Sequence, residues 1–390
     1  MKKTRVSIVK TVREPDEDAI EQAVRRAVTL AGGFEEVVSP RRRVLIKPNL
    51  VGVPDKRHPG AVTNPAICRA IADMVRERHA HPIIAESAQR GTDTEAVILA
   101  AGYAELRKKG YEVIDLKKTP ELKLDIPLGA AIRSIVTYDL AARVDAIISV
   151  PVLKTHDQLE VTLGLKNMKG LINDETKVLF HREGVIEGVV ELCAALKPSF
   201  TVVDGIIGQE GMGPMYGLPV EMDLIVAGMD TVAVDSVGGA IMGFEPGEVP
   251  ITVSAAKRGL GIMDLQDIDI AGETLDAVTR RFVRAHEDER VQVKGLSIVY
   301  DEGACTGCRN AVYSVVFDLV NQGKLEYLES VTLVAGSSVL PPETEHRRLI
   351  AVGRCCGREV RESGCYVKGC PPNNTHIMEA LTEAGGSRRL

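Results

Sequence analysis

The sequence predicts an α/β fold, in which a mainly parallel β-sheet is covered by helices and is followed by a smaller α/β domain. Short runs rich in β-branched residues alternate with amphipathic helical patterns up to about residue 285, and the alternation resumes after residue 296. Hydrophobic residues make up 45% of the 390 residues, which is enough material for sizeable cores. We therefore expect two domains, one over residues 1–290 and one over residues 297–390.

The elements of the larger domain can be assigned in chain order. The segment that follows Asn64-Pro65 has the amphipathic pattern of a helix with an N-terminal cap, and a second helical pattern ends at Gly110. Because parallel sheets bind ligands beyond the carboxyl ends of their strands, the polar residues after each apolar run are the candidates for a site. The residue pattern predicts helices over 64–78 and 94–110, and strands over 5–10, 42–49, 81–87, 111–116, 145–156, 199–208 and 223–230.

The smaller domain begins after a charged segment, residues 280–295, which we interpret as a closing helix and linker. Cysteines stand at or just after three of its strand ends, and this placement allows residues far apart in sequence to meet at one edge of a sheet. We expect strands over 296–300, 330–336 and 348–356, and helices over 310–323 and 375–384.

Composition excludes several classes of protein. The net charge of −6, the absence of tryptophan and the lack of a basic run with interleaved aromatics argue against a nucleic-acid partner. No stretch reaches the ~20 apolar residues of a membrane helix, and the first 20 residues lack the apolar core of a signal peptide. We therefore expect a cytoplasmic protein with no membrane partner, whose thiols are kept reduced.

Six of the eight cysteines fall in the smaller domain, between residues 305 and 370. Soft thiolates select zinc, copper(I) or iron–sulfur clusters, and a proline after a ligand cysteine is common in iron–sulfur proteins. A four-cysteine zinc site usually has two CxxC pairs, of which only Cys305–Cys308 is present, and a thioredoxin-like pair would leave the other cysteines without a role. The pattern favours a 4Fe-4S cluster, with zinc and thiol redox chemistry as alternatives.

The segments GACTGC, AVGRCCG and YVKGCPPN resemble, in this order, the proximal-cluster motifs of the small subunit of nickel–iron hydrogenases, and the cluster-bearing subunit of respiratory complex I shares GCPP. The resemblance covers about residues 297–390 and implies a flavodoxin-like half-fold with one 4Fe-4S cluster. The chain departs from the complex I pattern, because its adjacent cysteine pair lies at the later motif and Cys365 has no counterpart. The implied ligands are Cys305, Cys308, Cys355 and Cys370, with Cys356 as an alternative to Cys355.

The larger domain carries a second group of candidate residues, around PVLKTHDQLEVTLGLKNMKG. Lysines and a histidine near one strand end create a positive field that suits a carboxylate or phosphate group. Further polar residues follow the strands at 42–49, 81–87 and 199–208, the last of which opens a glycine-rich loop. We expect catalytic roles for Lys154, His156, Lys166, Asp204 and Glu210, and binding roles for Lys47, Asn49, Asn167, Lys169, Gly211 and Gly213.

Several of these residues have equally simple structural roles. Lys166 and Lys169 could be ordinary solvated lysines, and His156 could hydrogen-bond the backbone. Asp204, Glu210 and Asp230 could together hold a divalent cation, although Asp230 also suits the N-cap of a helix. Cys68 and Cys193 lie on apolar helical faces and are expected in the core.

Residues 42–260 resemble the uncharacterised family called domain of unknown function 362. The resemblance rests on VLIKPNLVG, TNP, AES, PVLKTHDQLEVTLGLKNMKGLI, VVDGIIGQEGMGP and AGMDTVAVDSVGGAIMG. Members often carry a ferredoxin-type cysteine module, and no settled reaction comes with the family name.

The leading hypothesis is an iron–sulfur redox enzyme or electron-transfer protein that binds an anionic small molecule and exchanges electrons with it or with a redox partner protein. One alternative is a non-redox binding or maturation protein with a structural cluster. A further alternative is a lyase or ligase with a zinc site.

Overall fold

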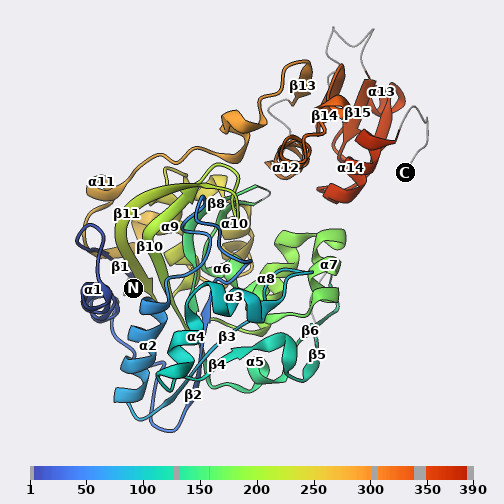
Figure 1. Cartoon of the computed structure of the whole chain (residues 1–390). Helices are drawn as coiled ribbons and strands as arrows, with labels where there is room; N and C mark the ends of the chain where they lie inside the picture. The colour runs from blue at the N-terminus through green and yellow to red at the C-terminus, as the bar shows by residue number, and fades with distance from the viewer. Residues whose placement is uncertain (1–3, 127–131, 158, 301–305, 338–347, 384–390) are drawn as a thin grey trace. The chain divides into compact units, whose positions relative to one another are not determined.

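The computed structural model describes residues 4–126, 132–157, 159–300, 306–337 and 348–383 (Figure 1). Contacts within the chain divide it into two compact units. The large unit comprises Met1–Lys154 and Val161–Phe282, and the cysteine-rich unit comprises Thr155–Glu160 and Val283–Leu390. The short segment Thr155–Glu160 therefore belongs to the cysteine-rich unit, although both of its ends continue into the large unit.

The large unit is built on a mainly parallel sheet with the strand order β12-β1-β11-β10-β7-β2-β3-β4, and β8 and β9 are attached to it through β10. The pairs of β11 with β1 and with β10 are antiparallel, whereas the other pairs along this order are parallel. The strands are β1 (Thr4–Lys10), β2 (Arg43–Pro48), β3 (His81–Glu86), β4 (Val113–Asp115), β7 (Ala146–Val150), β8 (Val152–His156), β9 (Glu160–Thr162), β10 (Phe200–Glu210), β11 (Leu218–Gly228) and β12 (Ile268–Gly272).

Helices cover both faces of this sheet. Val9 packs in one core cluster with residues of α1. Val6 lies beside Gly228 of β11, which Val234 of α9 also contacts, so alternate residues of β1 face opposite layers. The helices of the large unit are α1 (Glu17–Leu30), α2 (Pro65–Glu77), α3 (Thr94–Ala100), α4 (Tyr103–Lys108), α5 (Asp139–Arg143), α6 (Gly164–Asn167), α7 (Asp174–Glu183), α8 (Val185–Ala195), α9 (Thr231–Ile241), α10 (Pro250–Lys257) and α11 (Leu275–Val278).

The cysteine-rich unit contains a four-stranded parallel sheet with the order β13-β14-β15-β16. Its small core joins Val334, Leu349, Ala351, Cys356 and Val360. Its elements are β13 (Leu296–Val299), α12 (Thr306–Asn321), β14 (Val331–Ala335), β15 (Arg348–Val352), α13 (Arg358–Glu362), β16 (Cys365–Val367) and α14 (Asn374–Thr382).

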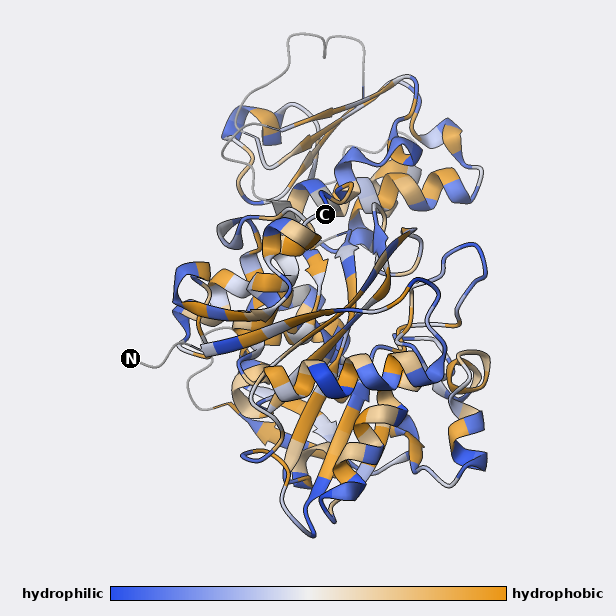
Figure 2. Ribbon diagram, turned by 90° about the vertical axis from the view of Figure 1, so that its left-hand side faces the viewer, coloured by the Kyte–Doolittle hydropathy of each residue, from blue (hydrophilic) through white to orange (hydrophobic). Residues whose placement is uncertain are grey.

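The remaining elements are short. Strands β5 (Glu121–Asp125) and β6 (Ser134–Tyr138) form an antiparallel pair. Figure 2 shows hydrophobic residues along the strands and polar residues in loops and on outward helix surfaces. The 3₁₀ turns are η1 (Leu116–Lys118), η2 (Met168–Leu171), η3 (Pro246–Glu248), η4 (Leu265–Asp267), η5 (Ala285–Glu287), η6 (Glu289–Val291) and η7 (Leu325–Tyr327). None of the helices that the structure describes is long and apolar enough to cross a membrane.

The predicted fold class is confirmed, but three predicted elements differ. The helix expected over 94–110 is broken into α3 and α4, because Gly102 adopts the left-handed conformation with φ +84°. The strand expected over 145–156 is divided at Pro151, which has no N–H to donate to a neighbouring strand. Residues 280–295 form the short turns η5 and η6 rather than a closing helix.

Candidate functional site

Buried polar side chains gather beyond the carboxyl ends of β2 and β3. The ammonium group of Lys47 is 1% exposed and forms an ion pair with the carboxylate of Glu86. It also donates to Pro48 O at 2.7 Å and to Asn167 Oδ1 at 2.9 Å. Burial lowers the pKa of Lys47, while the charge of Glu86 opposes this effect. The pair therefore holds two opposite charges in the core, each stabilised by the other.

Asn167, the last residue of α6, fastens this helix to the strand ends. Its Nδ2 donates to Lys47 O and to Ser149 Oγ, both at 3.0 Å. Gly170 follows three residues later and packs directly on the ion pair. A methyl group added at Gly170 would overlap the carboxylate of Glu86 and lie 2.7 Å from Lys47 Nζ. In the spacing Asn167-x-x-Gly170, the side-chain amide of Asn167 thus forms hydrogen bonds with the strand ends, and Gly170 has no side chain that would collide with the ion pair.

Lys154 on β8 is also buried, and its ammonium group donates to three oxygens. The acceptors are Asn49 Oδ1 at 3.0 Å, Ala61 O at 2.7 Å and Pro214 O at 3.0 Å. Burial holds the pKa of Lys154 well below its usual range, and neighbouring lysine charges add to the effect. Three acceptors match the three N–H groups of an ammonium, so these bonds favour the charged form. Lys154 therefore ties the loop after β2 to the glycine-rich loop after β10.

The glycine-rich loop contains Gly211 and Gly213, for which we expect ligand-binding roles. Gly211 has φ +76°, a conformation that favours glycine, and its carbonyl accepts from Gly213 N at 2.8 Å. The next residue, Pro214, provides the carbonyl that Lys154 binds. The hydrogen bonds named here therefore join this loop to itself and to Lys154.

A third buried lysine, Lys177 of α7, was not identified from the sequence. Its ammonium donates to Ser87 O at 3.1 Å, Ser87 Oγ at 2.9 Å and Ala88 O at 2.8 Å, and thereby fixes the segment that follows β3. Burial lowers the pKa of Lys177. In the sequence it is one lysine of an amphipathic helix, and no local signal separates it from a solvated one.

Two lysines and a histidine lie half-buried around α6, η2 and α7. Lys169 Nζ lies 2.6 Å from His181 Nε2, so these two basic groups are in direct contact. Lys166 lies close enough to Lys154 for its charge to lower the pKa of Lys154. Lys47, Lys154, Lys166 and Lys177 are thus coupled by charge or hydrogen bonds to the carboxylates Glu86, Asp174 and Asp204.

Two buried carboxylates position backbone near the site. Asp204 on β10 accepts from Asn64 N at 2.8 Å and Ile206 N at 3.1 Å, and burial raises its pKa to about 6. Asp235 on α9 accepts from Gly164 N at 2.7 Å and Leu165 N at 3.0 Å, and burial raises its pKa to about 7. Asp235 therefore holds the first turn of α6, which carries Lys166 and Asn167.

The other carboxylates considered for a divalent cation are engaged separately. Glu210 forms an ion pair with Arg280 at 3.2 Å. Asp230 caps α9 by accepting from Ala233 N at 3.1 Å, and also accepts from Ile262 N at 2.9 Å. Among the residues that the structure describes, no group of three or more His, Cys, Asp or Glu side chains could hold a metal ion. The divalent cation thus has no supporting carboxylate cluster in the described part of the chain.

His156, expected beside the lysines, lies in the segment Thr155–Glu160 of the cysteine-rich unit. Its Nδ1 lies 2.9 Å from Asp157 Oδ1 and 3.3 Å from Leu159 N. The chain passes from the large unit to the cysteine-rich unit between Lys154 and Thr155, so neighbouring residues of one motif belong to different units.

The cysteines of the implied cluster follow the ends of β15 and β16. Arg354 N donates to Gly369 O at 2.8 Å, and the exposed residues Cys355 and Cys370 directly follow this bonded pair. A methyl group added at Gly353 would overlap Cys308 Sγ, so Cys308 reaches the same edge from the first turn of α12. Cys305 lies outside the described residues.

The two remaining cysteines of this unit lie elsewhere. Cys356 is buried in the core, with its thiol 3.5 Å from Val334 O and 3.3 Å from Val352 O. Cys365 pairs with Ile350, three residues before Gly353, which at ~3.3 Å per residue puts it roughly 10 Å from the edge. Of the adjacent pair, Cys355 is thus exposed and Cys356 is buried. In the large unit, Cys68 and Cys193 are buried, as expected of core residues.

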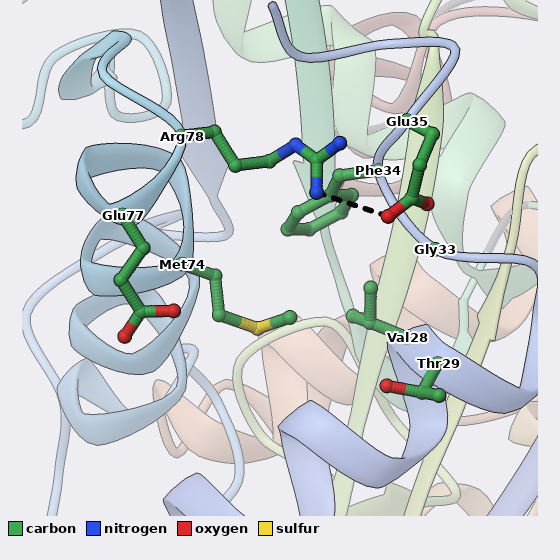
Figure 3. Close-up of a pocket in the computed structure, with 8 residues that line it drawn as sticks. All are labelled: Val28, Thr29, Gly33, Phe34, Glu35, Met74, Glu77 and Arg78. Atoms are coloured by element: carbon green, nitrogen blue, oxygen red, sulfur yellow. Dashed lines mark hydrogen bonds and ion pairs between the residues drawn. The ribbon is translucent and has the colours of Figure 1, made fainter.

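A hollow of about 270 Å³ lies between the C-terminal parts of α1 and α2 (Figure 3). Arg78 reaches across to Glu35 at 2.9 Å, and Glu77 forms an ion pair with Arg25. Its charged groups are thus engaged with one another, and none of the predicted site residues lines it. Its lining residues are Val28, Thr29, Gly33, Phe34, Glu35, Met74, Glu77 and Arg78.

Three comparisons relate the chain to known proteins. It is 31% identical over 258 residues, or 61% of this chain and 74% of the other, to a thylakoid-associated protein of Synechocystis sp. (strain PCC 6803). A solved structure of the lactate racemase apoprotein from Thermoanaerobacterium thermosaccharolyticum matches with a TM-score of 0.41 and 12% identity, over 97% of this chain and 90% of that chain. At this level the second match indicates neither a shared fold nor a shared function. The model of the family described as Domain of unknown function (DUF362) matches residues 44–240, and the chain belongs to this family.

Proposed function

We propose that this chain is an iron–sulfur protein whose large unit binds a small anion. The cysteine-rich unit would hold one 4Fe-4S cluster through Cys305, Cys308, Cys355 and Cys370. When bound, such a cluster supplies one-electron transfer. The chain would exchange single electrons with the bound anion or with a protein partner.

The observation that carries the proposal is where the cysteines stand in the chain. Cys355 and Cys370 each follow one residue of the bonded pair Arg354 and Gly369, Cys308 Sγ lies beside Gly353, and Cys356 turns into the core. Thiolates from a helix start and two strand ends suit a soft metal centre. Exposure of Cys355 and Cys370 suits ligands that face a bound group rather than the core.

The charge distribution supports an anion in the large unit. Lys47, Lys154 and Lys177 donate to oxygens of the chain and are therefore best understood as a positively charged frame. Lys166 and Lys169 lie at the half-buried edge of this frame and are the groups we propose to face the anion. A carboxylate or phosphate there would offset the repulsion that lowers the pKa of Lys154.

Metal analysis tests the cluster. We expect anaerobically purified chain to contain about four irons with matching sulfide, as four thiolates hold one such cluster, and to give an EPR signal after reduction with dithionite. Cys308→Ser and Cys370→Ser should lose most of the iron, whereas Cys356→Ser and Cys365→Ser should keep it. Zinc without iron in the wild-type chain would refute the redox function, and equal iron loss in all four variants would refute the ligand assignment.

Calorimetry with inorganic phosphate and with acetate tests the anion site. The double variant Lys166→Gln/Lys169→Gln should weaken binding at least tenfold, about 1.4 kcal/mol, because both charges proposed to face the anion are removed. Lys257→Gln, at the exposed end of α10, is the matched control and should bind as the wild type does. Unchanged binding in the double variant would exclude this site.

A further inference from the structure

We propose that Lys166, Lys169 and His181 form a site for a phosphate-type dianion, which binds with the uptake of one proton by His181. This inference rests on the anion site of the proposed function, and it names the class of the ligand and a third residue that binds it. All three residues belong to the large unit. The inference therefore depends on this unit alone and is independent of the cysteines.

The two lysines lie on one face of a single helical turn. Helix α6 continues directly into η2, and Lys166 and Lys169 are three residues apart, a spacing that makes side chains neighbours on a helix. Asn167 and Gly170, each one residue later, face the strand ends and the buried ion pair. One residue along a helix is a rotation of roughly 100°, so the half-buried lysines lie beside this inward face.

His181 brings a third basic group to this place from α7. Its Nε2 lies 2.6 Å from Lys169 Nζ. Lys177, four residues earlier and therefore on the same face of α7, points inward and binds the segment after β3. Lys177 thus holds α7 at the strand ends, and the next turn of the helix carries His181 to Lys169.

The contact between Lys169 and His181 holds one hydrogen. Two nitrogens 2.6 Å apart leave room for a single hydrogen between them, so one of the two groups is without its titratable proton. An imidazole loses its proton near neutral pH, whereas an ammonium keeps its own. His181 is therefore the neutral member, and its Nε2 accepts from Lys169. It can take up a proton from solvent when a bound anion stabilises the second positive charge.

The three nitrogens suit a dianion better than a monoanion. A phosphate group carries close to two negative charges and three acceptor oxygens, so Lys166, Lys169 and His181 can each donate to an oxygen of their own. In the bound form Lys169 and His181 donate to the dianion instead of sharing one hydrogen. A carboxylate has two oxygens and one charge, and it offsets the charge of a protonated His181 less well.

The groups around His181 leave it as the side chain that titrates near neutral pH. Asp174 is bonded to Lys117 and Lys177. Burial raises the pKa of Tyr138, which stays neutral. The glutamates of this region are exposed, where salt screens their charge. Besides His181, the titratable side chains described on η2, α7, β6 and the first turn of α8 are Lys169, Asp174, Glu175, Lys177, Glu183, Tyr138 and Glu187.

Isothermal calorimetry of the full chain with inorganic phosphate counts the protons, because the observed heat varies with the ionisation enthalpy of the buffer. In Tris and in triethanolamine at about pH 8, where phosphate is a dianion, the wild type should take up about one proton per phosphate. His181→Gln keeps an acceptor for Lys169 but should take up none and should bind phosphate about fivefold more weakly. His81→Gln, at the exposed amino end of β3, is the matched control and should behave as the wild type.

A second set of titrations tests the class of the ligand. Dimethyl phosphate has one charge and two terminal oxygens, and it should bind at least about tenfold more weakly than phosphate, without proton uptake. Phenyl phosphate distinguishes the source of the dianion. Tighter binding than that of inorganic phosphate indicates a phosphate monoester, weaker binding indicates the free ion, and both results support the dianion site.

The outcomes separate this inference from the proposed function. Phosphate binding that is weakened in Lys166→Gln/Lys169→Gln but occurs without proton uptake would overturn the inference and leave the anion site in place. Equal uptake in His181→Gln, or dimethyl phosphate that binds as tightly as phosphate, would do the same. A wild-type chain that binds none of these anions would overturn both. The wild-type proton count needs no variant, so the test holds even if His181→Gln fails to fold.

Discussion

The buried ion pair between Lys47 and Glu86 yields a quantitative prediction. The side chains are 1% and 4% exposed, so either variant that removes one charge leaves the other in the core. Lys47→Met and Glu86→Gln should each lower the free energy of unfolding by about 3–5 kcal/mol, as is typical when one partner of a buried pair is removed. The double variant should lose far less than the sum.

The expected coupling can be worked out from the contacts. After both substitutions no unpaired charge remains. The backbone N–H groups of Ser87 and Leu50 bond to the two Glu86 oxygens, and a glutamine side chain has only one oxygen, so the principal loss is one of these two hydrogen bonds. One unsatisfied buried group costs about 1–3 kcal/mol. The sum of the single losses should therefore exceed the loss in the double variant by roughly 3–9 kcal/mol.

Urea unfolding followed by far-ultraviolet circular dichroism is the suitable assay, because the chain has no tryptophan. The exposed pair Arg13–Glu221, at 3.1 Å with side chains 76% and 55% exposed, is the matched control, and its coupling should stay below about 1 kcal/mol. Additive single variants at Lys47 and Glu86, each losing less than about 1 kcal/mol, would refute the assignment of a buried charge pair.

The remaining predictions concern packing, hydrogen bonding and pH. Gly170→Ala should lower the free energy of unfolding by about 3 kcal/mol, because its methyl group displaces the carboxylate of Glu86, whereas Gly247→Ala, with open space around it, should change it by less than about 0.5 kcal/mol in urea unfolding. Lys154→Met should lose about 2–4 kcal/mol in urea unfolding because three buried acceptors lose their donor, and by calorimetry it should weaken phosphate binding less than Lys166→Gln/Lys169→Gln does, since it removes a charge of the frame and none that faces the anion; weak binding with normal stability would contradict a structural role. The folded-state pKa of Asp235 is raised from 3.8 to about 7, so the folded chain keeps this proton longer than the unfolded chain and the contribution of Asp235 to stability falls as the pH rises from about 4 to 7. Asp235→Asn should remove a slope worth about 4 kcal/mol over this interval, and parallel pH profiles of the two chains would argue against the shift.

The sequence predicted that polar side chains that follow the strands of the large unit would lie close together. Apolar runs followed by Lys47 and Asn49 placed these side chains beyond the carboxyl end of β2, and the structure brings both of them together with Asn167 and Lys154. This worked because the ends of parallel strands meet at one edge whatever the remaining packing. Asp230 likewise acts as the N-cap that its position before α9 suggested.

Other features depend on partners that no local pattern reveals. Lys177 has the spacing of a surface lysine, and only the loop after β3 makes it a buried donor. His156 stands two residues after Lys154, but its segment packs with residues more than 150 positions away. Gly102 breaks a helix that apolar periodicity predicts as continuous, because periodicity describes a face and is insensitive to one backbone angle.

The insertion of Thr155–Glu160 into the cysteine-rich unit has a consequence for how the protein forms. Asp157 and Ser314, which bond to each other, are separated by 157 residues, so during synthesis the segment emerges long before its partner helix. Contacts between residues so far apart in the sequence form late, and they reduce the folding rate because a long loop must close first. The nascent large unit would thus wait with one stretch unpacked, and a chain truncated after residue 282 should remain in that state permanently.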